Sequence, residues 1–379
     1  MGIKTPLHML EALKKARADG RYRVLAERSN SGVDFCSNDY LGLSKEVARS
    51  VEFTELLSQV EGQIGATGSR LVSGTTESHV LLEEKLAQFF RAEAALFFGS
   101  GYEANLALMS CIGSRGDTII FDKNIHASMR DGIRLSQARS YSFRHNDLED
   151  LRSKVANANG EVFVAVESLY SMDGDIAPLD GLCRLSQEMG FKLVVDEAHS
   201  TGIFGSYGEG LVCEYGQADI CFARVHTFGK AAGYKGACIV GGTTLKDYLI
   251  NFSRPFIYST APDLITIALI QEVLVLLRAA TDRRKQLVSN IALWGELVGA
   301  ARQATCFRPG SPVQVFKISG NEAVMAAQEL LERASFLVKG IRSPTVPEGA
   351  ERIRICLHNF NSTDDIRRLW ELLQNNFLT

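Results

Sequence analysis

The sequence predicts an α/β protein, with a large domain whose mostly parallel sheet is flanked by helices and a smaller α+β C-terminal domain. Between residues 77 and 241, short apolar runs alternate with segments of helical periodicity, the pattern of strands joined by crossover helices. After Pro262 the alternation stops, and a long helical stretch leads into mixed strands and helices. With 379 residues, of which 46% are hydrophobic, the chain is long enough for more than one core.

The expected strands of the large domain are short apolar runs. They occupy residues 94–98, 118–121, 162–166, 192–195, 220–225 and 237–241. Helices are expected over 77–91 and 101–109, from about 127, and from 178, where Pro178 would take the first helical position.

The two ends of the chain show a different pattern. Leu7, Leu10 and Leu13 recur at helical spacing and predict an amphipathic helix over 6–18. Further expected elements are strands at 33–36, 313–318 and 352–357 and helices at 264–297, 322–333 and 364–377. We therefore expect an N-terminal helix and arm over 1–44, a large domain over 45–260, and an interdomain helix with the small C-terminal domain over 261–379.

Composition narrows the function classes. The net charge of −3 provides no basic field for nucleic acid, and no apolar run reaches the length of a membrane span. The N-terminus lacks the apolar region of a signal peptide. The cysteines form no C-x-x-C pair, which favours reduced thiols over disulfides or a metal site and predicts a cytoplasmic protein. They stand at positions 36, 111, 183, 213, 221, 238, 306 and 356.

The segment His226-Thr227-Phe228-Gly229-Lys230 lies between two expected strands. Lysine is seldom buried unless it is paired or used, and a partly buried lysine can supply a neutral amine that forms a Schiff base with an aldehyde. The alternative is a surface lysine on a glycine-rich turn.

Asp196 ends the expected strand at 192–195 and is followed by Glu197-Ala198-His199. A carboxylate at the C-terminal end of a parallel strand faces the crevice where open α/β sheets bind ligands. Pyridoxal phosphate (PLP) needs a lysine for its imine and an acid beside its pyridine nitrogen, and Lys230 and Asp196 supply that pair. The alternative for Asp196 is a helix N-cap.

Gly99-Ser100-Gly101 leads from an expected strand into an expected helix. Free N–H groups and the helix dipole make such a helix start suitable for phosphate. The G-x-G-x-x-G spacing of a dinucleotide fingerprint is missing. The glycine- and serine-rich loop at 65–74 allows a close approach to a ligand, or forms plain turns.

Motifs along nearly the whole chain resemble, in the same order, those of the α-oxoamine synthases, which are PLP enzymes of fold type I. They are Ser-Asn-Asp-Tyr-Leu-Gly-Leu at 37–43, Gly-Ala-Thr-Gly-Ser-Arg-Leu-Val-Ser-Gly at 65–74, His-x-x-Leu-Glu at 79–83, Ser-Gly-Tyr-x-Ala-Asn at 100–105, His-Ala-Ser at 126–128, Ser-Met-Asp-Gly-Asp-x-Ala-Pro-Leu at 171–179, Val-Asp-Glu-Ala-His at 195–199, Thr-Phe-Gly-Lys-Ala at 227–231 and Pro-Thr-Val-Pro-x-Gly at 344–349. Within the family, Phe-Ile-Tyr-Ser-Thr-Ala at 256–261 is similar to the branch that makes 8-amino-7-oxononanoate for biotin.

The resemblance implies roles around the PLP ring. Lys230 would hold the cofactor and act as general base, Asp196 would pair with the pyridinium nitrogen, and His126 would stack on the ring and contact the substrate. His199 and Ser171 would reach the ring hydroxyl. The alternatives are a polar surface position for His126 and a satisfied polar core for His199 and Ser171.

The resemblance also implies how the phosphate is bound. The backbone amides of Gly101 and Tyr102, together with Thr227, would bind it at the helix N-terminus. Ser259 and Thr260 match residues that reach the phosphate from a second subunit, which implies a homodimer with shared sites.

For the substrate, the resemblance implies that Arg354 holds the amino acid carboxylate, which suits a guanidinium fork. Asn38 and Thr345 would assist it. The alternative for Arg354 is an exposed charge on a strand. An arginine near the N-terminus would contact the acyl substrate, and the candidates are Arg17, Arg21 and Arg23.

The implied reaction is the decarboxylative condensation of L-alanine with pimeloyl-CoA, or a carrier thioester, to 8-amino-7-oxononanoate, CoA and CO₂. The alternatives are a sister enzyme that takes glycine with acetyl-CoA or serine with a palmitoyl-type donor, and a non-catalytic partner subunit. Arg224-Val225-His226 and Tyr234-Lys235 depart from the expected family pattern.

Overall fold

The computed structural model of the chain describes residues 4–25, 27, 31–50, 55, 58, 60, 64–299 and 308–378, so Cys306 lies outside the described residues. Contacts group the chain into two compact units. The large unit comprises 38–171 and 175–285, and the small unit comprises 1–37, 172–174 and 286–379. This grouping assigns residues 261–285 to the large unit, whereas the sequence analysis assigns them to the C-terminal domain.

The large unit is built on a seven-stranded sheet with the strand order β2-β8-β7-β6-β5-β3-β4. Within this sheet β8 runs in the opposite direction to the other six strands. The strands are β2 (Ala94–Phe98), β3 (Thr118–Asp122), β4 (Arg139–Phe143), β5 (Val162–Glu167), β6 (Lys192–Asp196), β7 (Ala223–Thr227) and β8 (Ala237–Gly241). The predicted α/β fold with a mostly parallel sheet is confirmed.

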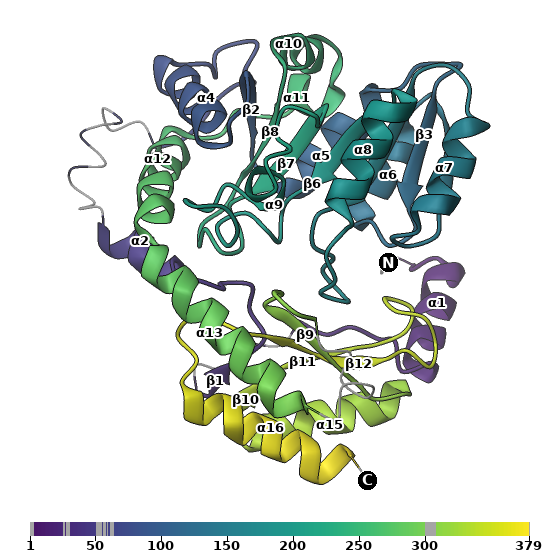
Figure 1. Ribbon diagram of the computed structural model, residues 1–379, viewed down its shortest axis with the longest axis vertical. Coiled ribbons are helices and arrows are strands. Elements are labelled where there is room, and N and C mark those ends of the chain that lie inside the picture. The colour runs from purple at the N-terminus through teal and green to yellow at the C-terminus, as the bar shows by residue number, and fades with distance from the viewer. Residues whose placement is uncertain are drawn as a thin grey trace. The chain divides into compact units, whose positions relative to one another are not determined.

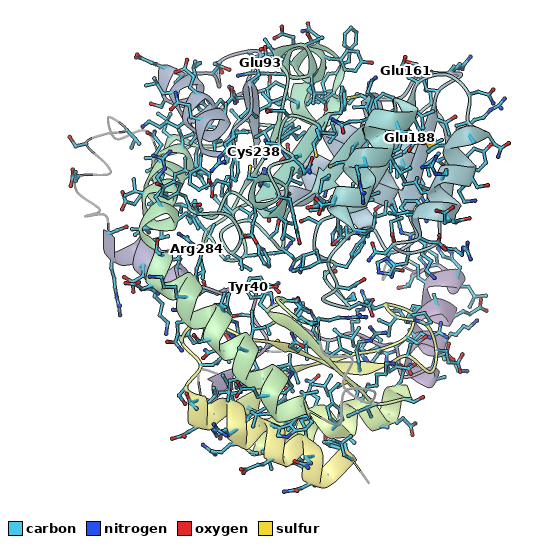
Figure 2. All side chains as sticks on the ribbon, in the orientation of Figure 1. Tyr40, Glu93, Glu161, Glu188, Cys238 and Arg284 are labelled. Atoms are coloured by element: carbon cyan, nitrogen blue, oxygen red, sulfur yellow. The ribbon has the colours of Figure 1, made fainter. Side chains whose placement is uncertain are left out.

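Helices cover both faces of this sheet (Figure 1). The helices of the large unit are α2 (Ser44–Ser50), α4 (Glu77–Phe89), α5 (Gly101–Cys111), α6 (Ala127–Leu135), α7 (Leu148–Ala156), α8 (Leu179–Met189), α9 (Leu211–Glu214), α10 (Thr243–Phe252), α11 (Arg254–Ile257) and α12 (Leu264–Ala279), of which α2 packs on α12 and α12 on α4. Helix α5 packs against α6, β7 and β8, where Val225 and Ile239 are buried. Figure 2 shows Cys238 inside this unit, whereas the exposed Glu93, Glu161 and Glu188 lie on its outside.

Strand β7 begins and ends later than the predicted strand at 220–225. Residues 218–220 form a turn, and the strand continues through the buried polar residues His226 and Thr227. The Arg224 guanidinium donates to the carbonyl oxygens of Phe90, at 2.6 Å, and of Arg91, at 3.2 Å. The His226 ring stacks on Phe90 with 3.7 Å between ring centroids, and its Nδ1 lies 2.9 Å from the Thr201 hydroxyl. These two departures from the expected family pattern therefore pack the strand that leads to Lys230.

Three further sequence predictions need correction. Pro178 is the N-cap of α8, one position before the predicted one. The predicted helix at 264–297 is two helices, because α12 ends before Ala280 and α13 (Thr281–Val298) begins after it. The sequence analysis missed β4, an edge strand whose first four residues are exposed and which therefore carries no apolar run.

The small unit contains a three-stranded sheet of order β11-β12-β9 and a parallel pair β1-β10. Its elements are α1 (Leu7–Ala18), β1 (Val33–Asp34), β9 (Val313–Lys317), α15 (Asn321–Arg333), β10 (Phe336–Leu337), β11 (Lys339–Ile341), β12 (Arg352–Cys356) and α16 (Thr363–Phe377), with the larger part of α13.

In the part of the chain that the structure describes, no single helix is long and apolar enough to span a membrane. Helices α12 and α13 meet the length and composition test only as a bent pair.

An ion network ties together loops of the large unit. His145 Nδ1 lies 2.9 Å from the Asp122 carboxylate, and its Nε2 contacts Asp175. The ring also meets Tyr170 edge-on, with 4.5 Å between centroids. Burial disfavours the charged imidazole, but the two carboxylates outweigh burial and raise the pKa of His145 to about 9.

Replacing His145 by Gln tests this network. A raised pKa stabilises the fold fully below the usual histidine value of about 6.5, and this contribution is lost as the pH rises through 9. We expect His145→Gln to lower the free energy of unfolding by roughly 2–4 kcal/mol at pH 6 and by much less at pH 9.5, measured by urea unfolding.

Arg144→Gln is the matched control, because the exposed Arg144 side chain forms surface ion pairs with Asp147, at 2.9 Å, and with Asp150, at 3.8 Å, and exposed pairs contribute little to stability. It should change stability little at either pH. An equal loss for His145→Gln at both values would show that His145 is not charged in the folded protein.

Candidate functional site

A cavity of about 360 Å³ lies at the C-terminal ends of β2, β5, β6 and β7 in the large unit. This is where parallel α/β sheets bind ligands, and the volume falls in the range of small-molecule pockets. The predicted site residues that line it are Asn38, Gly101, Tyr102, His126, Asp196, His199, Thr227 and Lys230. With Glu167 at the end of β5, six parts of the sequence thus meet at one edge of the sheet.

Asp196 ends β6 and is only 4% exposed. Its Oδ2 accepts a hydrogen bond from Asn105 Nδ2 at 2.7 Å, and its Oδ1 accepts one from the backbone N–H of Ala198 at 2.8 Å. No regular helix starts at Asp196, since α9 begins only at Leu211, so the N-cap alternative is wrong. The carboxylate is oriented toward the cavity by two donors.

Lys230 follows β7 in a closed turn. The backbone N–H of Gly233 donates to the Lys230 carbonyl oxygen, and that of Tyr234 donates to the Phe228 carbonyl oxygen, both at 2.8 Å. The Lys230 side chain is partly buried and lines the cavity together with Asp196. The alternative of a lysine on an open surface turn is therefore wrong.

His126 is the N-cap residue of α6, and its ring lies on the cavity wall. Its Nδ1 lies 2.8 Å from the Ser128 hydroxyl. Burial lowers the pKa of His126, the charge of Asp196 opposes that shift, and the charge of Lys230 supports it. The ring is therefore held toward its neutral form, as a flat face beside the Asp196 carboxylate.

A buried tyrosine links two predicted residues. The Tyr40 hydroxyl lies 2.8 Å from His199 Nδ1 and donates to Asn38 Oδ1 at 3.1 Å. Tyr40 is fully buried and His199 is 5% exposed. Tyr40 therefore fixes both side chains on one wall of the cavity.

The N-terminus of α5 also lines the cavity. Ser100 caps the helix, because its hydroxyl accepts from the Glu103 backbone N–H at 3.2 Å. A Cβ on Gly101 would lie 2.5 Å from Thr227 Cγ2, so only glycine lets β7 pack this closely against the helix start. The first backbone N–H groups of α5 and the Thr227 side chain thus lie close together, in an arrangement suited to binding an anion.

Three predicted residues of the large unit do not line the cavity. The backbone N–H of Ser171 approaches the Glu167 carboxyl group, and Thr260 forms an isolated bridge with Ser69. Ser259 contacts the Glu103 carboxylate and lines a second cavity, of about 680 Å³.

Thr345 and Arg354 belong to the small unit. Arg354 lies in β12 and is 7% exposed, so its alternative as an exposed strand charge is wrong. Arg23, one of the three candidate N-terminal arginines, donates to the Thr345 hydroxyl at 3.4 Å. Among the described residues, no cluster of three or more His, Cys, Asp or Glu side chains could hold a metal ion.

The sequence analysis did not assign roles to Tyr40, Asn105 and Glu167. Tyr40 and Asn105 stand inside two of the motifs quoted for the family resemblance, so a signal was present. Glu167 ends β5 as Asp196 ends β6, and the two residues are paired in register. Its position after an apolar run could have identified it.

Comparison with known proteins agrees with this geometry. The family model for aminotransferase class I and II matches residues 30–372. The 8-amino-7-oxononanoate synthase of Marinobacter nauticus is 36% identical over 355 residues, which cover 92% of this chain and 88% of the relative.

Two solved structures are also similar. The 8-amino-7-oxononanoate synthase from Francisella tularensis has a TM-score of 0.77 and 30% identity, covering 92% of this chain and 98% of its own. The serine palmitoyltransferase from S. paucimobilis, solved with bound PLP and myriocin, has a TM-score of 0.87 and 25% identity, covering 97% and 96%. The chain therefore belongs to the aminotransferase class I and II family, in the branch that contains the 8-amino-7-oxononanoate synthases.

Proposed function

We propose that the chain is a PLP-dependent acyltransferase of biotin synthesis. It condenses L-alanine with pimeloyl-CoA, or with a carrier thioester, and releases 8-amino-7-oxononanoate, the free thiol and CO₂. The observation that carries this proposal is the meeting of Lys230 and Asp196 in one cavity beside the N-terminus of α5, in a chain that is 36% identical to an 8-amino-7-oxononanoate synthase.

The residues present fit PLP. The start of α5 with Gly101 and Thr227 suits its phosphate, the Asp196 carboxylate suits its ring nitrogen, and Lys230 offers an amine for its aldehyde. Asn105 Oδ1, on the cavity wall, is buried and has no hydrogen-bond partner among the described residues, as expected of an atom that faces a ligand. When bound, PLP supplies an electron sink for a carbanion at the amino acid α-carbon.

Three side chains of the cavity would act directly on the cofactor and the substrate. Asp196, oriented by Asn105 and Ala198, would keep the ring nitrogen protonated. The Lys230 amine, once released, would take the α-proton as general base. The neutral His126 ring would stack on the cofactor and leave the Asp196 charge for the nitrogen.

Other roles complete the proposal. His199, held by Tyr40, and Ser171 would bind the ring hydroxyl. The amides of Gly101 and Tyr102 would bind the phosphate. Arg354 would pair with the substrate carboxylate, which a guanidinium binds through two parallel hydrogen bonds, assisted by Asn38 and Thr345.

We also propose that the protein is a cytoplasmic homodimer, in which Ser259 and Thr260 of each copy serve the phosphate site of the other. Neither residue lines the cavity of its own chain, which supports a role in a second copy. Sedimentation analysis would measure the oligomeric state.

Gly101→Ala tests the phosphate end of the site. The new Cβ would press on the Thr227 methyl group at 2.5 Å and displace it or the helix start. We expect PLP affinity to fall about ten- to hundredfold, as for the loss of one charge-assisted hydrogen bond. Fluorescence titration of the apo-protein with PLP measures this.

Thr227→Ser removes the obstructing methyl group and keeps the hydroxyl. Combined with Gly101→Ala it should recover most of the affinity, and alone it should change affinity little. A double variant as weak as Gly101→Ala would show that the helix N-terminus and Thr227 do not form the phosphate site.

Substrate choice tests the reaction itself. A pimeloyl chain carries its own terminal carboxylate, which a synthase specific for it should bind by a charge-assisted interaction. We expect the highest kcat/KM for L-alanine with pimeloyl-CoA, and a clear loss when the terminal carboxylate is esterified. Thiol release, measured with alanine, glycine and serine in turn, checks this.

Acetyl-CoA and palmitoyl-CoA are the comparison donors. A higher kcat/KM for glycine with acetyl-CoA, or for serine with palmitoyl-CoA, would contradict the proposed substrates and favour a sister enzyme. Absence of thiol release with every pair, although PLP binds, would favour a non-catalytic partner subunit.

A further inference from the structure

Glu167 is a second carboxyl group in the same cavity. It ends β5, is paired in register with Asp196 on β6, and is only 3% exposed. Its Oε1 is buried and has no hydrogen-bond partner among the residues that the structure describes. Both oxygens of Asp196, by contrast, accept hydrogen bonds.

Two neighbouring buried carboxyl groups cannot both ionise cheaply. Burial raises the pKa of Glu167 well above its usual value, and the negative charge of Asp196 raises it further. The charge of Lys230 and the backbone amides of His126 and Ser171 oppose these effects without cancelling them. Burial and the neighbouring carboxylate therefore favour the protonated form of Glu167.

The other titratable group beside Glu167 is the Tyr170 phenol. It is buried, and both burial and nearby carboxylates, Glu167 among them, raise its pKa well above the usual value. Tyr170 is therefore neutral and does not compete with Asp196 for the negative charge.

The strand order indicates which part of a bound cofactor Glu167 faces. Thr227 on β7 would hold the phosphate and Asp196 on β6 would pair with the ring nitrogen, while Glu167 on β5 lies on the side of β6 away from β7. In PLP the ring edge across from the phosphate-bearing carbon carries a methyl group and the ring hydroxyl, and of these only the hydroxyl oxygen can accept a hydrogen bond. We propose that Glu167 is a further catalytic residue, a neutral carboxylic acid that donates a hydrogen bond from its partnerless oxygen to the ring oxygen of bound PLP.

This inference rests on PLP binding, the first part of the proposed function, and not on the identity of either substrate. Two substitutions at Glu167 distinguish a neutral hydrogen-bond donor from a charged carboxylate. A neutral donor is replaced well by Gln, which is also neutral and carries an N–H donor, and poorly by Leu. If Glu167 instead acts as a base or pairs with a cation as a carboxylate, Glu167→Gln and Glu167→Leu lose that function equally.

The first test uses the apo-protein. A carboxyl group with a raised pKa makes the fold less stable as the pH rises from the ordinary glutamate value of about 4.3 toward the raised value. Glu167→Gln lacks this titration, so its stability relative to wild type should increase as the pH rises from 5 to 8 in urea unfolding. A difference that is constant over that range would overturn the proposal.

The second test uses PLP as the probe. We expect Glu167→Gln to bind PLP about tenfold more tightly than Glu167→Leu, and the pH titration of the PLP absorbance to shift in Glu167→Leu while staying close to wild type in Glu167→Gln. Equal loss of affinity and an equal spectral shift in both variants would overturn the proposal.

Glu161→Gln is the matched control. Glu161 precedes the same strand, but it lies exposed on the outside of the large unit (Figure 2) and pairs only with Lys192, at 3.7 Å. It should leave both measurements unchanged. If no 8-amino-7-oxononanoate forms, the substrate assignment fails, whereas both Glu167 tests still decide, since neither needs turnover.

Discussion

The site depends on one buried negative charge, the Asp196 carboxylate at the end of β6. An unpaired buried charge is costly unless donors surround it. Asn105 on α5 donates one hydrogen bond to Asp196 and the backbone of Ala198 donates another. Because Asn105 Nδ2 also contacts Ser128 on α6, this single carboxylate couples β6 to both helices that flank the cavity.

The sheet supports that charge from the neighbouring strands. On one side, β7 carries the buried Arg224 and His226, whose partners are backbone carbonyls, Phe90 and Thr201. These contacts fix the strand that positions Thr227 and the Lys230 turn. On the other side, β5 brings Glu167 next to Asp196, where burial and the Asp196 charge raise the pKa of Glu167. Lys230, Asp196 and Glu167 thus line one cavity because the adjacent strands β7, β6 and β5 end at the same edge of the sheet.

Apolar periodicity predicted most strands of the sheet, because a buried parallel strand needs a continuous apolar run. It failed at β4, an exposed edge strand, at the start of β7, where the apolar run begins in a turn, and at the end of β7, where the polar His226 is buried with partners distant in sequence. Asp196 and Lys230 were predictable from strand ends. Tyr40, inside a family motif, and Glu167, at a strand end, could also have been selected as candidates, but their partners lie in distant segments, which spacing along the chain does not reveal.

The most direct test of the account is to identify the lysine that bonds to PLP. PLP-loaded protein is reduced with borohydride, digested, and mapped by mass spectrometry. We predict the label on the peptide that contains Lys230, lost in Lys230→Ala and retained in Lys235→Ala, since Lys235 lines the same cavity but is exposed and lies 3.7 Å from Asp263. A label on Lys235 or on any other lysine would contradict the account.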